Sequence, residues 1–322
     1  MADRDCWCSS QDLRGFSAEY ARCSACGTLV ALAGLSDEAL QVKNDDTDFY
    51  GKQYWLQHQS KDLGHPDIFG RAREDLIERN LHWLRTLKRY KLPGAKVLEL
   101  GCSHGSFVAM LRQAGYDASG MEMSPWVVNF AKETFDIPVI VGPVETTGLS
   151  NGSFDVVALM DVLEHLPDPT RTMQYALNLL SPNGIMLIQT PQFREEMNYK
   201  TLVETKAAFL AQLKSDEHLY LFTEASVSTL FKRLGVDYIR FEQPIFHQYD
   251  MFFVVSRQPI EPVTETKKDP LLTPKGRFVQ ALLDQDQKIK ELEEHIKVID
   301  ADRAARLEQI HVLTEMINER RG

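Results

Sequence analysis

Nine residues, Val97-Leu-Glu-Leu-Gly-Cys-Ser-His-Gly105, contain the clearest structural signal in this sequence. Three apolar residues and one acid precede Gly101, which is typical of a short strand buried in a sheet. The two glycines then favour a tight turn, because glycine adopts left-handed backbone conformations without strain. A strand, a glycine turn and a helix in this order predict one unit of an α/β sheet, with a ligand site at the carboxyl end of the strand.

Strands and helices alternate after this turn. Ser124-Pro125 and Asp168-Pro169 each place a capping residue before a proline, which predicts the start of a helix. Alternation of this kind implies a mostly parallel sheet with helices on both faces. We therefore predict an α/β, Rossmann-like fold with a seven-stranded sheet. The expected strands are 96–101, 117–122, 138–142, 154–160, 184–190, 236–242 and 250–256, and a helix is expected near 223–234.

The segments that flank this sheet differ in composition. Leucine and isoleucine recur at helical spacing between 68 and 90, which predicts one amphipathic helix that ends at Pro93-Gly94. Four prolines without periodicity indicate a linker further on. The predicted organisation is a zinc-ribbon module at 1–34, a helical lid or substrate region at 35–92, the α/β domain at 93–258, a linker at 259–274 and a coiled-coil helix at 275–322.

The last segment carries a heptad repeat. Position a is occupied by Leu282, Ile289, Ile296, Arg303, Ile310 and Ile317, and position d by Phe278, Gln285, Leu292, Ile299, Arg306 and Leu313. Apolar residues at most a and d positions favour a coiled coil, so we expect a homo-oligomer that forms through 278–317. Dimer and trimer both remain open. The alternative is a helix that folds back on its own domain.

Net charge and hydropathy exclude some functions. The formal net charge is -10, which argues against broad binding to a nucleic-acid backbone. No apolar run is long enough to span a bilayer, and residues 1–5 lack the basic and apolar regions of a signal peptide. We therefore expect a cytoplasmic protein without a transmembrane segment.

Four of the five cysteines fall within the first 26 residues. They are Cys6, Cys8, Cys23 and Cys26. A reducing cytoplasm disfavours disulfides, and two close pairs of thiolates can hold zinc in a tetrahedral site. We predict a structural zinc ion here. The alternative is a ribbon that has lost its metal.

Three segments together carry a family resemblance. They are Val97 to Gly105, Gly120-Met-Glu-Met-Ser124, and Phe154 to Met160 followed by Asp161-Val-Leu-Glu-His-Leu-Pro-Asp-Pro169. This set resembles the class I methyltransferases that depend on S-adenosyl-L-methionine (SAM). The turn does not match the Gly-x-Gly-x-x-Gly spacing of dinucleotide-binding folds. Ser103 stands where the methyltransferase turn usually carries another glycine.

The resemblance implies a set of residues for SAM. Gly101 and Gly105 shape the turn, and Glu99 orients the ammonium end. Glu122, the acid at the end of the second strand, binds the ribose hydroxyls, as a corresponding acid does in dinucleotide-binding folds. The Val144 N–H is the expected adenine contact, with Glu145 as an alternative, because Pro143 cannot donate a hydrogen bond. The remaining expected cofactor residues are Trp55, Cys102, Ser103, Met123, Met160 and Asp161.

A cluster of acids and histidines suggests the chemistry. Asp161-x-x-Glu164-His165, with His218 further on, resembles the metal-dependent O-methyltransferases of the ubiquinone-biosynthesis and small-RNA 3′-end types. That resemblance implies Mg²⁺ or a similar divalent ion on Asp161, Glu164, His165 and His218, although those families usually have Glu at the position of Asp161. The alternative is metal-free catalysis, in which His165 or His218 acts as the general base, with Glu217 as a weaker candidate.

The acceptor is inferred by analogy. Similar N-terminal ribbons precede the catalytic domain in some bacterial sugar methyltransferases, so we expect O-methylation of a sugar hydroxyl in a glycan or nucleotide sugar. A coiled coil suits a complex with glycan-assembly proteins. Two alternatives stay open: a small-molecule O-methyltransferase for catechol-like or polyketide hydroxyls, and a SAM-binding scaffold that acts through its coiled coil.

Overall fold

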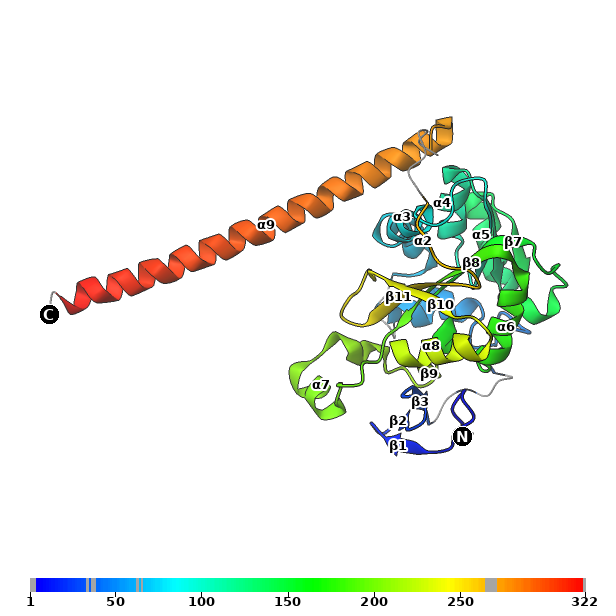
Figure 1. Ribbon diagram of the computed structural model, residues 1–322, viewed down its shortest axis with the longest axis horizontal. Coiled ribbons are helices and arrows are strands. Elements are labelled where there is room, and N and C mark those ends of the chain that lie inside the picture. The colour runs from blue at the N-terminus through cyan, green and yellow to red at the C-terminus, as the bar shows by residue number, and fades with distance from the viewer. Residues whose placement is uncertain are drawn as a thin grey trace.

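A computed structural model of the chain describes residues 4–32, 35, 39–61, 64, 66–263 and 271–320. A seven-stranded sheet forms its centre (Figure 1). The spatial order is β10-β11-β8-β7-β4-β5-β6. The strands are β4 (Lys96–Leu100), β5 (Asp117–Glu122), β6 (Val139–Val141), β7 (Phe154–Met160), β8 (Leu180–Pro191), β10 (Tyr238–Glu242) and β11 (Asp250–Ser256).

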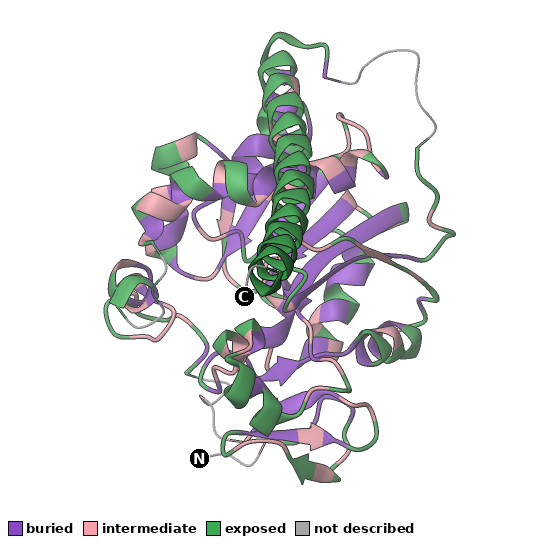
Figure 2. Cartoon of the chain, turned by 90° about the vertical axis from the view of Figure 1, so that its left-hand side faces the viewer, coloured by how far each residue is buried: buried purple, intermediate pink, exposed green. Residues whose placement is uncertain are grey.

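The sheet is mostly parallel, as predicted. Strands β6, β5, β4, β7 and β8 run parallel, whereas β11 is antiparallel to both β8 and β10. Helices cover both faces, and the strands between them are buried (Figure 2). The helices of this domain are α4 (Ser106–Ala114), α5 (Pro125–Phe135), α6 (Pro169–Leu179), α7 (Tyr199–Thr205) and α8 (Glu224–Arg233), with short turns η2 (Val144–Thr146), η3 (Leu163–His165) and η4 (Ala208–Gln212).

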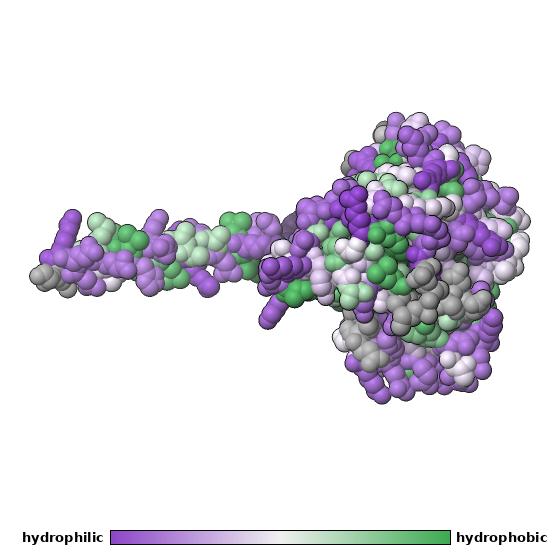
Figure 3. Space-filling model, turned by 90° about the horizontal axis from the view of Figure 1, so that it is seen from below, coloured by the Kyte–Doolittle hydropathy of each residue, from purple (hydrophilic) through white to green (hydrophobic). Residues whose placement is uncertain are grey.

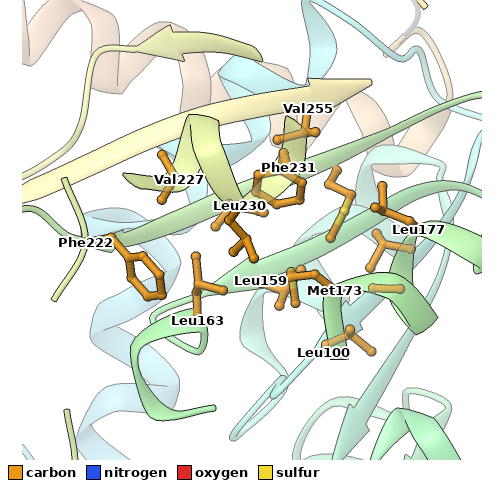
Figure 4. Packing of buried hydrophobic residues seen from close by; sticks show 14 of the residues in the cluster. Leu100, Leu159, Leu163, Met173, Leu177, Phe222, Val227, Leu230, Phe231 and Val255 are labelled. Atoms are coloured by element: carbon orange, nitrogen blue, oxygen red, sulfur yellow. The ribbon is translucent and has the colours of Figure 1, made fainter. Parts of the chain in front are cut away.

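Two apolar layers hold the sheet in place. On one face, Met173 and Leu177 of α6 and Leu230 and Phe231 of α8 pack toward Leu159 of β7 (Figure 4). On the other face, α3 and α4 belong to a second apolar cluster with the opposite side chains of the same strands, and the start of α9 packs on α3 and α4. Burial of apolar surface on both faces explains why strands β4, β7 and β8 are apolar along most of their length.

The segment before the sheet forms two helices where the sequence predicts one. After a π-helical turn η1 (Tyr54–His58) and α1 (Gln59–Lys61), α2 (Ile68–Glu78) is followed by α3 (Asn80–Lys88). The chain bends at Arg79, whose φ of -115° departs from the helical value. The side chain of Arg79, at this bend, forms an ion pair with Asp161, 82 residues away.

The cysteine-rich segment forms a small second sheet. Strands β1 (Leu13–Gly15), β2 (Tyr20–Cys23) and β3 (Leu29–Ala31) are antiparallel, and β9 (Tyr220–Leu221) adds to β3 as a fourth strand. Cys6, Cys8, Cys23 and Val30 belong to the same apolar cluster as Phe222. The cysteine-rich segment therefore packs directly onto the α/β core.

The chain ends in one long helix, α9 (Pro274–Glu319). Its first turns are anchored, because Val279 and Leu283 are buried and Asp286 pairs with Arg85 of α3. Beyond this anchor the helix projects from the body and is exposed on all sides (Figures 1 and 2). Apolar side chains nevertheless recur along it (Figure 3). Part of the linker predicted at 259–274 lies outside the described residues. Among the described helices, none has the length and apolar character that crossing a membrane requires.

Candidate active site

A cavity of about 890 Å³ opens at the carboxyl ends of the parallel strands. The turn after β4, the end of β5, the end of β7 and the loop before β9 all contribute to its wall. This is the edge of an α/β sheet where ligands bind, and the volume is typical of small-molecule sites. Predicted residues that line it are Trp55, Glu99, Gly101, Cys102, Ser103, Glu122, Met123, Val144, Met160, Asp161, Glu164, His165 and His218.

Buried polar atoms without a hydrogen-bond partner converge on this cavity. Six such side-chain atoms occur in the described part of the chain, and all six belong to residues that line it. Buried polar atoms are nearly always paired, so a group of orphans in one cavity indicates a missing polar ligand. The atoms are Trp55 Nε1, Arg79 Nε, Asn80 Oδ1, Glu99 Oε2, Ser103 Oγ and Glu164 Oε1.

The glycine turn has the conformation that its sequence requires. Gly101 has a φ of 67° and Gly105 a φ of 82°, both in the left-handed region. A Cβ on Gly101 would lie 2.6 Å from Val162 Cγ2, and one on Gly105 would collide with Ile137. Ser103 also has a positive φ, of 49°, so it adopts a conformation in which a glycine would be unstrained. Gly105 does not line the cavity, but its left-handed conformation shapes the turn.

Two acids lie beneath this turn. Glu122 Oε1 accepts hydrogen bonds from Met123 N (2.8 Å) and Ser124 N (3.2 Å), and Oε2 accepts one from Ser103 N (3.1 Å). These bonds fix the carboxylate at the end of β5. Glu99 is fully buried, and its pKa is raised well above its usual range by burial and by the charge of Glu122. A buried acid with one unpaired oxygen is suited to a cationic ligand group.

Three potential metal ligands come together elsewhere on the cavity wall. One donor atom each from Glu164, His165 and His218 lies within 4.8 Å of the others. Glu164 and His165 lie on η3, and His218 lies in the loop before β9. The Oε2 atom of Glu164 accepts a bond from Thr190 Oγ1 (2.9 Å), while Oε1 is unpaired and lies 3.8 Å from His165 Nε2.

Hydrogen bonds orient both histidines in the same way. The Nδ1 atom of His165 lies 2.8 Å from the Glu217 carbonyl oxygen, and Nδ1 of His218 lies 2.8 Å from that of Gln212. A carbonyl only accepts, so each Nδ1 carries the proton and each Nε2 keeps its lone pair. Burial also lowers the pKa of both imidazoles, which favours their neutral form. Two neutral imidazoles and a carboxylate with a free oxygen fit a divalent cation.

Asp161 has different partners. Its Oδ2 accepts from Arg79 Nη1 (2.9 Å) and its Oδ1 from Gln189 Nε2 (3.0 Å), whose own Oε1 accepts from Trp83 Nε1 (2.9 Å). Asp161 has a φ of 57°, an unusual conformation for a residue with a side chain. These bonds hold the carboxylate at the cavity wall, outside the group formed by Glu164, His165 and His218.

Several residues of this site escaped the sequence analysis. Hydrogen bonds reach Asp161 from Arg79 and Gln189. Burial, together with the charge of Asp161, raises the pKa of Asp250 to about 9. Gln189 had a detectable signal, since it is a polar residue near the end of an otherwise apolar strand. Glu217, by contrast, is a candidate base from the sequence; it accepts from Tyr54 OH (2.9 Å) and lies 3.0 Å from His58 Nε2, which connects the lid region to the loop of His218.

The four N-terminal cysteines form a separate cluster. One sulfur from each of Cys6, Cys8, Cys23 and Cys26 lies within 4.8 Å of the others. The Cys6 and Cys26 sulfurs are 3.5 Å apart, and those of Cys8 and Cys23 are 3.6 Å apart. Four sulfurs around one point are the donor set of a closed structural zinc site.

Comparisons with known proteins identify the family of the chain. The model of a family described as a methyltransferase domain matches residues 69–240, just over half of the chain. Ubiquinone biosynthesis O-methyltransferases of Xanthomonas campestris pv. campestris and Xanthomonas oryzae pv. oryzae are 32% identical over 108 residues, which cover 32% of this chain and 45% of each relative. The chain thus spans about half the length of the curated relatives that it matches.

Solved structures give weaker likenesses. Magnesium protoporphyrin IX methyltransferase of Synechocystis, with bound SAH, has a TM-score of 0.43 and 18% identity, and the alignment covers 58% of this chain and 84% of that one. A complex of the Haloferax volcanii Trm112 methyltransferase activator with a methyltransferase has a TM-score of 0.45 and 17% identity, with 60% and 97% covered.

Proposed function

This chain belongs to the SAM-dependent methyltransferases, and from that membership we propose that it methylates an oxygen of a hydroxylated acceptor held by a divalent cation. The observation that carries the proposal is the convergence of Glu164, His165 and His218 on the cavity that contains the glycine turn. A cofactor site and a cation site in one cavity allow a methyl group and an acceptor oxygen to meet.

The cofactor would lie along the turn after β4. Glu122 would accept bonds from the ribose hydroxyls, and the unpaired oxygen of Glu99 would pair with the ammonium group. SAM supplies an electrophilic methyl group on a sulfonium. Trp55, Met123 and Val144 lie on the cavity wall and would contact the adenine end.

Glu164, His165 and His218 would hold the cation. A cation bound there supplies positive charge that lowers the pKa of a coordinated hydroxyl. Three protein ligands leave coordination positions for two neighbouring acceptor oxygens. In the transfer, the acceptor oxygen would bond to the methyl carbon as the carbon–sulfur bond breaks, the sulfur would keep that electron pair, and the proton of the acceptor hydroxyl would pass to solvent. Without a cation, the Nε2 of His165 or His218 would accept that proton.

For the acceptor we favour a sugar hydroxyl in a glycan or nucleotide sugar, which presents the neighbouring oxygens that such a site requires. The match to ubiquinone biosynthesis O-methyltransferases supports a second candidate, a catechol-like small molecule. A SAM-binding scaffold with little turnover is a third. The intact set of ligands and the buried unpaired Glu164 Oε1 weigh against the scaffold, because a scaffold has no need of them.

The N-terminal cluster and the cellular location complete the proposal. Four sulfurs within 4.8 Å support a structural zinc ion on Cys6, Cys8, Cys23 and Cys26. Free thiols that serve a metal suit a reducing compartment, so we place the protein in the cytoplasm.

Methyl-labelled SAM incubated with separated cell fractions tests the reaction. We expect label in a fraction of nucleotide sugars or lipid-linked glycans, loss of that label with EDTA, and recovery when Mg²⁺ or Mn²⁺ is restored. Label confined to small aromatic metabolites would favour the second candidate. Transfer that EDTA leaves intact would contradict the role of the cation, and absence of transfer despite SAM binding would favour the scaffold.

We further propose that α9 forms a homo-oligomeric coiled coil, with glycan-assembly proteins as further partners. The apolar a and d positions of the repeat are exposed over a helix of 46 residues, and an exposed apolar seam favours association. Ile299 at position d is 64% exposed and the neighbouring Val298, off the seam, is 61% exposed.

Ile299→Glu should therefore shift the protein toward monomer, whereas Val298→Glu should leave its oligomeric state unchanged. Both variants add the same charge to the same stretch of helix. A difference between them therefore shows that the chains associate through the a and d positions. Sedimentation equilibrium against the chain mass of 36.7 kDa measures the result. A monomeric parent protein at micromolar concentration, or an equal effect of both variants, would contradict the coiled coil.

A further inference from the structure

The cysteine-rich module is joined to the loop that carries His218. Strand β9 begins two residues after His218, and it pairs with β3 through Leu29↔Leu221 and Val30↔Tyr220 (Figure 1). The Ala31 N–H also donates to the Leu219 carbonyl oxygen at 3.0 Å. Backbone hydrogen bonds thus connect the cysteine-rich segment to Leu219, the residue that follows His218.

One side chain extends this connection to His218 itself. Tyr20 lies on β2, is fully buried, and donates from its hydroxyl to the His218 carbonyl oxygen at 2.8 Å. Its ring packs in a cluster with Phe193 and Leu221. The buried ring has no room to move, so the hydroxyl is held at a fixed point.

Two hydrogen bonds consequently fix His218 from opposite ends. The bond from Tyr20 holds the main chain, and the bond from Nδ1 to the Gln212 carbonyl holds the ring. The main chain here is also held by the bond from the His218 N–H to the Lys214 carbonyl oxygen (2.7 Å), and the Tyr20 bond adds a restraint from the cysteine-rich module to this arrangement. Ligand orientation of this kind determines the strength of a metal site, because a ligand that must be ordered on binding costs entropy.

We propose that Tyr20 is a positioning residue for His218, through which the N-terminal cysteine module sets the cation affinity of the active site. The inference rests on the proposed divalent cation site. It assigns the module a function in addition to its own stability: β2 and β3 form the support on which a distant metal ligand is oriented.

Tyr20→Phe tests this, with Mn²⁺ as the probe. Mn²⁺ prefers oxygen and nitrogen ligands, so it reports the Glu164 and histidine site rather than the thiolate cluster. We expect Mn²⁺ affinity, measured from the EPR signal of the free ion, to fall by about tenfold or more, as is typical when an outer-shell partner of a metal ligand is lost. Zinc content and SAM affinity should stay unchanged. The His218→Ala variant gives the EPR signal that is expected when the cation site is absent.

Tyr116→Phe is the matched control. Tyr116 is also buried, and its hydroxyl donates to a main-chain carbonyl, that of Lys91, at 2.7 Å. Tyr116 lies outside the cavity wall, so this variant should lose an equivalent hydrogen bond and keep its Mn²⁺ affinity.

The outcomes separate the two proposals. If Tyr20→Phe binds Mn²⁺ as tightly as the parent protein, or if it loses SAM affinity and zinc to the same degree as Mn²⁺, the positioning role is refuted while the cation site stands. If the parent protein binds Mn²⁺ no better than His218→Ala, the cation site itself is refuted, and the role of Tyr20 falls with it.

Discussion

Replacement of Glu164 by glutamine is expected to abolish most of the methyl transfer while leaving the fold intact. Glutamine has the shape of glutamate and can still accept the bond from Thr190 through its amide oxygen. It lacks the negative charge that attracts a cation. We expect Mn²⁺ affinity and transfer rate to fall by at least about 100-fold, more than follows the loss of an outer-shell partner. Transfer of labelled methyl groups at saturating SAM measures the effect.

Stability provides the internal check on this variant. Burial raises the pKa of Glu164 well above its usual range, so the folded protein without a cation gains little from a charge at this position. Glu164→Gln should therefore unfold at the same urea concentration as the parent protein, or a higher one. Glu242→Gln is the control for removal of a carboxylate: its side chain is also largely buried, but it pairs with Arg89 away from the cavity. Equal losses of transfer in both variants would contradict the cation site.

The central sheet could be predicted because its signals are local. The strand expected at 154–160 and that expected at 250–256 coincide with β7 and β11. Each strand is an apolar run between turn residues, and each of the helices α5 and α6 starts at a capping residue before proline. The fold class and the SAM-dependent methyltransferase family are confirmed. The roles of individual site residues and the domain boundaries stay predictions.

The parts that could not be predicted depend on contacts between distant residues. Arg79, at the bend between α2 and α3, pairs with Asp161 82 residues away, and Tyr20 reaches a carbonyl 198 residues away. Periodicity reports which face of an element is apolar, but it contains no information on which polar side chains will meet. Glu164 and His165 are neighbours in sequence, but His218 could be grouped with them only through a family resemblance, and the bonds that orient these side chains were not foreseen.

The terminal helix marks an intermediate case. Its heptad register can be read from sequence, and the structure has one continuous helix over the same residues. A heptad repeat does not state where its partner is. A single chain leaves the seam exposed, so the partner is to be sought in a second molecule, as the comparison of Ile299→Glu with Val298→Glu is designed to test.

The second large effect is expected from Cys23→Ser, which should remove zinc and unfold the N-terminal sheet. Cys23 ends β2, is fully buried, and has its sulfur 3.6 Å from that of Cys8. Serine cannot supply a thiolate, and structural zinc sites contribute about 10–16 kcal/mol of binding energy to folding in small modules. We expect loss of the single zinc ion per chain and a decrease of more than about 3 kcal/mol in the free energy of unfolding. Zinc analysis and urea unfolding measure both quantities.

Cys102→Ser controls for the loss of a buried thiol, because Cys102 lies in the glycine turn, apart from the four clustered sulfurs. It should keep one zinc ion per chain. A parent protein without zinc, or a Cys23→Ser variant as stable as the parent, would contradict a structural zinc site. The position of β9 adds a consequence for catalysis. Since β3 pairs with the strand that follows His218, a chain that loses its N-terminal sheet should also lose Mn²⁺ affinity, while SAM, whose proposed site lies along β4 and β5, should still bind.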